Sequence, residues 1–142
     1  MTNEQSIRPQ PSRRILRRVG AVLAGLVLIV TLDISIDVIM HATGIYPPWF
    51  QPMRTSLWLL AIGYRTIDSI LGSYLTATLA PDRPLAHALV LGIVGVVLSS
   101  MGAFATWNKG PEFGPRWYPI AVVIIALPCA VIGGTLRQRQ LK

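Results

Sequence analysis

The sequence predicts an all-α integral membrane protein in which four transmembrane helices form two helical hairpins, with the N- and C-termini in the cytoplasm. Of the 142 residues, 52% are hydrophobic and 13% are charged, whereas a soluble domain carries about 25% charged residues. The mean hydropathy is +0.53. Four apolar segments each approach the ~20 residues that a bilayer requires, and the last two contain no charged residue.

The first fourteen residues are polar and basic and contain Pro9 and Pro11. Because they show no apolar period, residues 1–14 are predicted to be a disordered cytoplasmic tail. Residues 15–142 are predicted to form the transmembrane domain, with spans at about 19–41, 56–79, 85–106 and 118–136. Each span must be helical, since backbone groups in hydrocarbon need hydrogen-bond partners within their own segment.

The distribution of positive charge predicts the orientation. Nine Lys and Arg residues fall on the side of the two termini and three on the other side, a bias that places the termini in the cytoplasm. The expected location is a bacterial inner (plasma) membrane, crossed several times. All four tryptophans lie near the outer ends of their spans, a distribution typical of an interfacial aromatic belt. The nine residues are Arg8, Arg13, Arg14, Arg17, Arg18, Arg83, Arg137, Arg139 and Lys142, and the three are Arg54, Lys109 and Arg116.

Two weaker patterns concern packing and ancestry. Small residues recur every four positions in the first, third and fourth spans, which favours close helix contacts; they are Gly20, Ala21, Ala24, Gly25, Gly95, Ser99, Ala103, Ala126, Ala130 and Gly134. A faint repeat at an offset of 63 residues suggests that the two hairpins are a parallel duplication. Chance similarity between apolar segments is the alternative.

Charged side chains in the first two spans are the candidate site. Asp33, Asp37 and His41 have the spacing i, i+4, i+8 and therefore share one helix face. Asp33 lies about 12 Å from the outer end of its span and Arg65 about 13.5 Å from the outer end of the next, so antiparallel helices bring the two level. Asp68 can pair with Arg65 along their common helix.

The charge balance at this site is uneven. The net charge of the site is −2 when His41 is neutral, because Arg65 is the one cation beside Asp33, Asp37 and Asp68. A low-dielectric helix bundle does not tolerate such an imbalance. Either one or two aspartates hold protons, or a cation is bound, or water reaches the site from outside. The structural alternative is a buried ion pair between Arg65 and two aspartates that fixes the helix register, with the third aspartate hydrated.

We expect no metal site, no cofactor and no enzyme. Asp33 and His41 are about 12 Å apart along the helix axis, too far to share one ion without a second helix, although Asp37 with His41 alone is feasible. No Ser or Cys nucleophile has a base at helical spacing, and no Gly-rich phosphate loop is present. The net charge of +7 sits in the flanks of apolar spans, so the expected partner is the lipid bilayer and not a nucleic acid.

Two functional hypotheses follow. In the first, the protein is a small proton- or cation-handling transport or channel subunit: Asp33, Asp37 and Asp68 bind the ion, Arg65 adjusts their proton affinity and His41 lines the outer entrance. Four spans seldom enclose a pathway alone, so a homo-oligomer is expected. In the second, the protein is a non-catalytic accessory or structural subunit of a larger membrane complex. The network is then a buried ion pair, and the Pro- and Trp-rich outer loops dock a partner.

Overall fold

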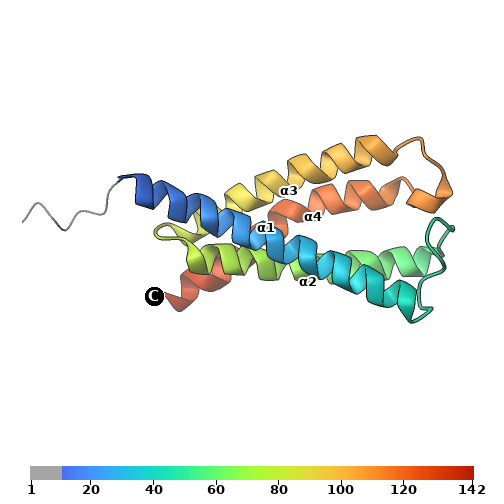
Figure 1. The fold of residues 1–142 in the computed structure, drawn as a ribbon. Helices are drawn as coiled ribbons and strands as arrows, with labels where there is room; N and C mark the ends of the chain where they lie inside the picture. Colours follow the sequence, from blue (N-terminus) through green and yellow to red (C-terminus); the bar gives the residue numbers. More distant parts are fainter. Residues whose placement is uncertain (1–10) are drawn as a thin grey trace, which may run out of the picture.

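The computed structural model describes residues 11–142. It contains four long helices, α1 (Pro11–Ala42), α2 (Thr55–Leu79), α3 (Pro84–Thr106) and α4 (Trp117–Gln140), and one short 3₁₀ turn, η2 (Pro111–Phe113). The all-helical fold class with four helices is therefore confirmed. The start of α1, the C-terminus and the turn 80–83 lie at one end of the bundle, which we call the terminal end; the loops 43–54 and 107–116 lie at the other, the loop end (Figure 1).

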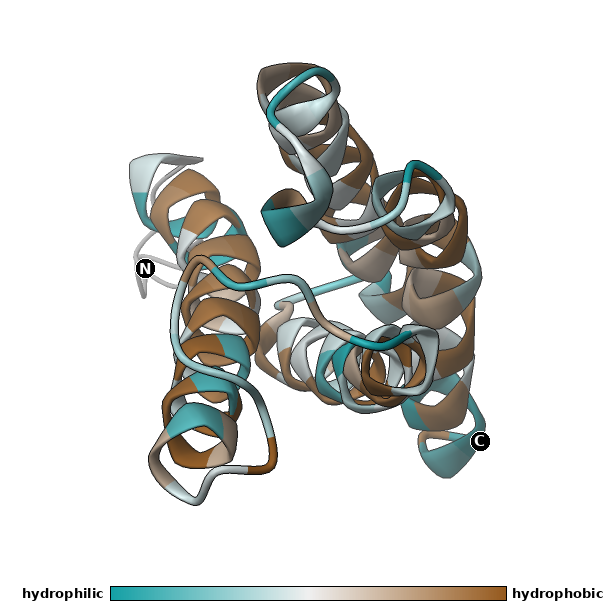
Figure 2. Ribbon diagram, turned by 90° about the vertical axis from the view of Figure 1, so that its right-hand side faces the viewer, coloured by the Kyte–Doolittle hydropathy of each residue, from teal (hydrophilic) through white to brown (hydrophobic). Residues whose placement is uncertain are grey.

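Three helical segments are long and apolar enough to cross a membrane: Ser12–Ala42, Pro84–Thr106 and Pro111–Gln140. With 25 residues, α2 is long enough to cross a membrane. Arg65 and Asp68 lie near its middle and lower its mean hydropathy, so α2 is not among the three segments apolar enough to do so. Figure 2, which looks onto the loop end, shows hydrophobic colouring along much of the helices and hydrophilic colouring in parts of the loops, at helix ends and in several bands on α1.

Glycine and proline set the helix boundaries. α1 begins at Pro11, so residues 11–14 of the predicted tail are helical, whereas residues 1–10 lie outside the described part of the chain. α1 ends just before Gly44, whose φ of +75° is accessible to glycine at little cost. α2 stops before Pro81, and α3 starts with Pro84 in its first turn, where a missing N–H costs nothing.

The charged helix α2 is the centre of the bundle, because it contacts α1, α3 and α4. Glycines allow these close approaches. A Cβ on Gly72 of α2 would lie 2.3 Å from Cγ1 of Ile29 of α1, and one on Gly133 of α4 would lie 2.6 Å from the Ile70 carbonyl oxygen of α2. α1 lies at the edge of the bundle, since it packs mainly on α2 and only lightly on α3.

Several of the small residues expected at helix contacts are confirmed there. Ala21, Gly25, Ala130 and Gly134 are buried, and Gly95 faces Ala126 across the α3–α4 contact. Gly20 is different: nothing lies within 4 Å of its would-be Cβ. The sequence pattern did not single out Gly72, Gly92 and Gly133, which make some of the closest approaches.

Candidate functional site

Arg65 joins α2 to two carboxylates of α1. Its Nη1 donates to Oδ2 of Asp33 and its Nη2 donates to Oδ2 of Asp37, each at 2.8 Å. The predicted alignment of Asp33 with Arg65 across antiparallel helices is therefore what the geometry gives. Because Asp33 and Asp37 are one helical turn apart, the two prongs of one guanidinium reach both.

Asp68 departs from expectation. Its spacing allows it to pair with Arg65 along α2, but Arg65 forms its ion pairs with Asp33 and Asp37 instead. The third aspartate is also not at the surface: Asp68 is only 3% exposed. The surplus carboxyl group is therefore the most buried of the three, which places an uncompensated acid close to the middle of α2.

The Asp68 carboxyl group lies next to that of Asp33, within reach of a side-chain hydrogen bond. Oδ1 of Asp33 and Oδ2 of Asp68 are both buried and have no hydrogen-bond donor among the described residues. Two ionised carboxylates are acceptors only, so a hydrogen bond between them requires a proton on one of them. The pair can thus hold one proton between α1 and α2.

Tyrosines extend the network toward the loop end, and sequence reasoning missed them. The Tyr64 hydroxyl donates to Oδ1 of Asp37, and the buried Tyr46, whose hydroxyl donates to the Leu57 carbonyl oxygen, lines the same side of the network. Tyr64 directly precedes Arg65 in the sequence. This position would have identified Tyr64 as a partner of Asp37 only if the rotation of α2 about its axis were known. The polar groups form one row from the 43–54 loop to Asp68. Along the axis of α2, Asp68 lies about 20 Å from the first residue of that helix.

His41 is part of the loop structure and not of the carboxylate cluster. Its Nδ1 lies 2.7 Å from the Pro47 carbonyl oxygen, and its ring stacks on Trp49 with the centroids 3.6 Å apart. His41 also borders the cavity described next.

A cavity of about 280 Å³ leads from the loop end to the network. Its lining includes Asp37 and Arg65, with aromatic rings from both loops and from α2 and α4 around them. The side chains of Asp37 and Arg65 are each 25% exposed, so solvent reaches this side of the network. The lining residues are Asp37, His41, Tyr46, Trp49, Phe50, Gln51, Met53, Trp58, Ala61, Tyr64, Arg65, Glu112, Phe113 and Tyr118.

Beyond Asp68, toward the terminal end, α1 and α2 close against each other. Gly72, Ser73 and Thr76 are buried, and a Cβ on Gly25 would lie 1.9 Å from the Thr76 hydroxyl oxygen and 2.6 Å from the Gly72 carbonyl oxygen. This packing leaves no room for water between the helices. Among the described residues, this contact separates the network from the terminal end along the α1–α2 interface.

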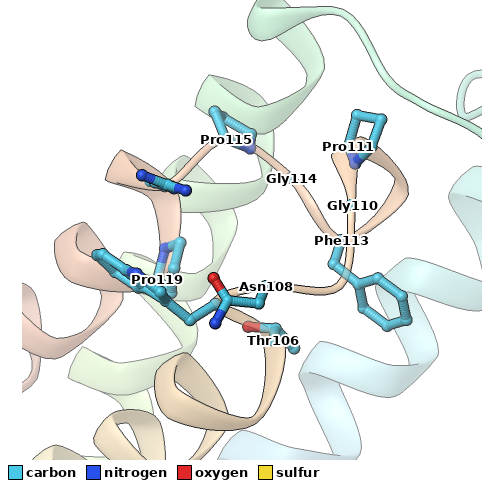
Figure 3. Close-up of a pocket in the computed structure, with 10 residues that line it drawn as sticks. Thr106, Asn108, Gly110, Pro111, Phe113, Gly114, Pro115 and Pro119 are labelled. Atoms are coloured by element: carbon cyan, nitrogen blue, oxygen red, sulfur yellow. The ribbon is translucent and has the colours of Figure 1, made fainter.

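A second hollow at the loop end has a different character. It measures about 390 Å³ and is formed by the 107–116 loop with the adjoining ends of α3 and α4. Figure 3 shows that its walls are largely proline, glycine and Phe113, with Thr106 and Asn108 as the labelled polar side chains. Arg116, its one charged residue, lies over the Trp107 ring at 5.7 Å. Without an acidic group, this hollow offers no proton site.

The described residues hold no group of three or more His, Cys, Asp or Glu side chains close enough to bind a metal ion together. The spacing of Asp37 and His41 allows the two to bind a metal ion together, but their side chains have other partners. Asp37 bonds to Arg65 and Tyr64, and Nδ1 of His41 faces the Pro47 carbonyl oxygen.

Fold and site together define a class: an all-helical protein, with three helices long and apolar enough to cross a membrane and a partly buried cluster of one arginine, three aspartates and one tyrosine. Comparison of the chain with protein-family models, with curated proteins and with solved structures finds no significant match. The function must therefore be argued from the site itself.

Proposed function

We propose that this chain is a multi-pass protein of the bacterial inner membrane, with all four long helices crossing the bilayer and both termini in the cytoplasm. The hydropathy of α1, α3 and α4 supports three crossings. The burial of its charged residues supports the fourth, because Arg65 pairs with two carboxylates of α1 and Asp68 is only 3% exposed. The excess of Lys and Arg on the terminal side supports the orientation.

Within that frame, the protein binds and releases protons at the Asp33–Asp68 carboxyl pair, as a small transport or channel subunit. One observation carries this proposal: Arg65 pairs with two of the three aspartates, and the third carboxyl group, that of Asp68, is buried beside Asp33 with an oxygen that lacks a donor among the described residues. A buried charge without a partner costs several kcal/mol. A proton on the pair removes that cost.

The arrangement gives the proton a route from one side. Tyr64, Asp37 and Arg65 connect the cavity at the loop end to Asp33, and α1 packs closely on α2 at Gly25 and Gly72 on the terminal side. Passage to the terminal end requires α1 to move relative to α2, or a second subunit to complete the path. Since α1 sits at the edge of the bundle, it is the helix with the fewest contacts to break, and assembly as an oligomer fits its large exposed apolar face.

The second candidate function is that of an accessory or structural subunit of a larger membrane complex. The observation that favours it is the same Arg65 bridge, which fixes the register of α1 against α2 without any ion flow. In this case the Trp- and Pro-rich loops at the loop end form the docking surface.

The duplication of the two hairpins is also part of the proposal. An offset of 63 residues relates α2 to α4, and these two helices contact each other along the centre of the bundle. The symmetry is incomplete, because α2 packs on α3 more extensively than α1 packs on α4.

Reconstitution separates the two functions. We expect pH-dependent proton uptake by vesicles containing the wild type, loss of uptake in Asp68→Asn and Asp33→Asn, and unchanged uptake in Asp82→Asn, which lies outside the network. Proton flux no greater than that of empty vesicles would favour the second function, a structural or accessory subunit. Flux that persists in both network variants would move the proton site elsewhere.

A further inference from the structure

At the terminal end, four arginines gather on the first turns of α1. Arg13, Arg14, Arg17 and Arg18 are paired by i, i+4 spacing on adjoining faces of the helix. Together with Pro81 and Asp82 of the turn between α2 and α3, they line a groove of about 540 Å³. The groove is thus built from two segments that lie far apart in the sequence.

The charge of this groove is strongly unbalanced. Asp82 is its single acidic residue, and it accepts a hydrogen bond of 2.5 Å from Nη2 of Arg18. That hydrogen bond lowers the pKa of the Asp82 carboxyl group below its ordinary value, so the ion pair persists at neutral pH and holds Arg18 in place. Four arginines and one aspartate leave a net charge of +3 on the lining. Arg13, Arg14 and Arg17 have no acidic partner among the described residues.

The position of the groove indicates what kind of anion it binds. Ile15 and Leu16 lie between the arginines in the sequence but on the other side of the helix, where they are 59% and 70% exposed. The groove sits at the first turns of Ser12–Ala42, a segment long and apolar enough to cross a membrane. In the proposed topology its guanidinium groups therefore lie at the depth of the lipid headgroups, where basic residues attract anionic lipids. Guanidinium is suited to bidentate binding of phosphate oxygens. The bilayer holds a phospholipid headgroup at this depth, and it does not hold a soluble phosphate there.

We infer that the groove between the first turns of α1 and the 80–83 turn binds the phosphate headgroup of an anionic phospholipid. The inference rests on the membrane location in the proposed function and not on proton binding. Absence of proton uptake would leave the lipid site intact, and absence of lipid binding would leave the proton site intact.

The test is native mass spectrometry of the full chain purified in detergent, titrated with phosphatidylglycerol or with phosphatidylcholine. We expect phosphatidylglycerol to bind in preference. The variant Arg13→Gln/Arg14→Gln/Arg17→Gln should weaken this binding by about tenfold or more, given the attraction per basic residue near an anionic lipid surface. The matched control, Arg137→Gln/Arg139→Gln/Lys142→Gln, removes the same charge from the other terminus and should change it by less than about twofold.

Three results would overturn the inference. Equal weakening in both triple variants would mean general electrostatic attraction. Equal binding of phosphatidylcholine would mean that the headgroup charge is not recognised. Displacement of the lipid by an equal concentration of inorganic phosphate would assign the groove to a soluble anion.

A measurement on the wild type does not depend on the variants being folded. A photoactivatable phosphatidylglycerol should label peptides from residues 11–27 and 80–90. Labelling confined to other segments would contradict the site.

Discussion

Arg65 of α2 and Asp33 of α1 meet at the same depth of the bundle, with Nη1 of the arginine 2.8 Å from Oδ2 of the aspartate. The two residues are 32 positions apart and lie on antiparallel helices. This contact sets the register of the first hairpin, and it determines which carboxyl group is left over for a proton.

The pairing predicts the outcome of a double-mutant cycle. Arg65→Ala should reduce the free energy of unfolding in mixed micelles by about 3 kcal/mol, because it leaves partly buried carboxylates without a cation. Combining it with Asp33→Asn should recover about 1 kcal/mol or more relative to the sum of the two single changes.

The control for this cycle is Asp82→Asn, which is remote from Arg65 and should add to Arg65→Ala independently. Strict additivity of Arg65→Ala with Asp33→Asn as well would show that the two residues do not interact in the folded protein.

Tyr64 should contribute stability through its hydroxyl group. Tyr64→Phe removes the donor to Asp37 and should cost about 1.5 kcal/mol, the range for a hydrogen bond to a charged group. Tyr74→Phe is the matched control in the same helix, since the Tyr74 hydroxyl donates to Gln140 in an exposed position, and it should cost less than about 0.5 kcal/mol. Equal losses in the two variants would argue against a hydrogen bond between Tyr64 and Asp37.

The contact between α1 and α2 should be sensitive to a single methyl group. In Gly72→Ala the new Cβ would lie 2.3 Å from Ile29 and 2.8 Å from the Gly25 carbonyl oxygen. The helices must separate, at a cost of about 1–3 kcal/mol.

Gly63 of the same helix has nothing within 4 Å of its would-be Cβ. Gly63→Ala should therefore be neutral, or stabilising by up to about 1 kcal/mol through helix propensity. Thermal unfolding of the two variants in detergent checks this, and a Gly72→Ala protein as stable as Gly63→Ala would contradict the close packing.

The proposed topology predicts labelling from two sides. After replacement of the buried Cys129 by alanine, cysteines introduced at Asn108 and Gln51, both at the loop end, should react with a membrane-impermeant maleimide added outside intact cells. A cysteine at Gln138, at the terminal end, should react only after the membrane is opened. If the cysteines at positions 108 and 138 were labelled from the same side, α4 would not cross the membrane between them, and the proposed topology would be wrong.

Sequence patterns alone were sufficient to predict the helical class, the number of helices and the level at which Asp33 and Arg65 meet. Each depends on spacing along one chain segment: apolar length, the 1.5 Å rise per residue and the position of prolines and glycines. The same spacing placed all four tryptophans near one end, where Trp49, Trp58, Trp107 and Trp117 lie in or beside the two loops.

Only the tertiary structure decided which aspartate is the surplus acid. Sequence distance gives the depth of a side chain along a helix but not the rotation of one helix about its axis relative to its neighbour. The packing of Gly25 on Gly72 sets that rotation. It turns Asp37 toward Arg65 and Tyr64, and it leaves Asp68 buried beside Asp33, because a guanidinium that reaches across to α1 is not available to a carboxylate on its own helix.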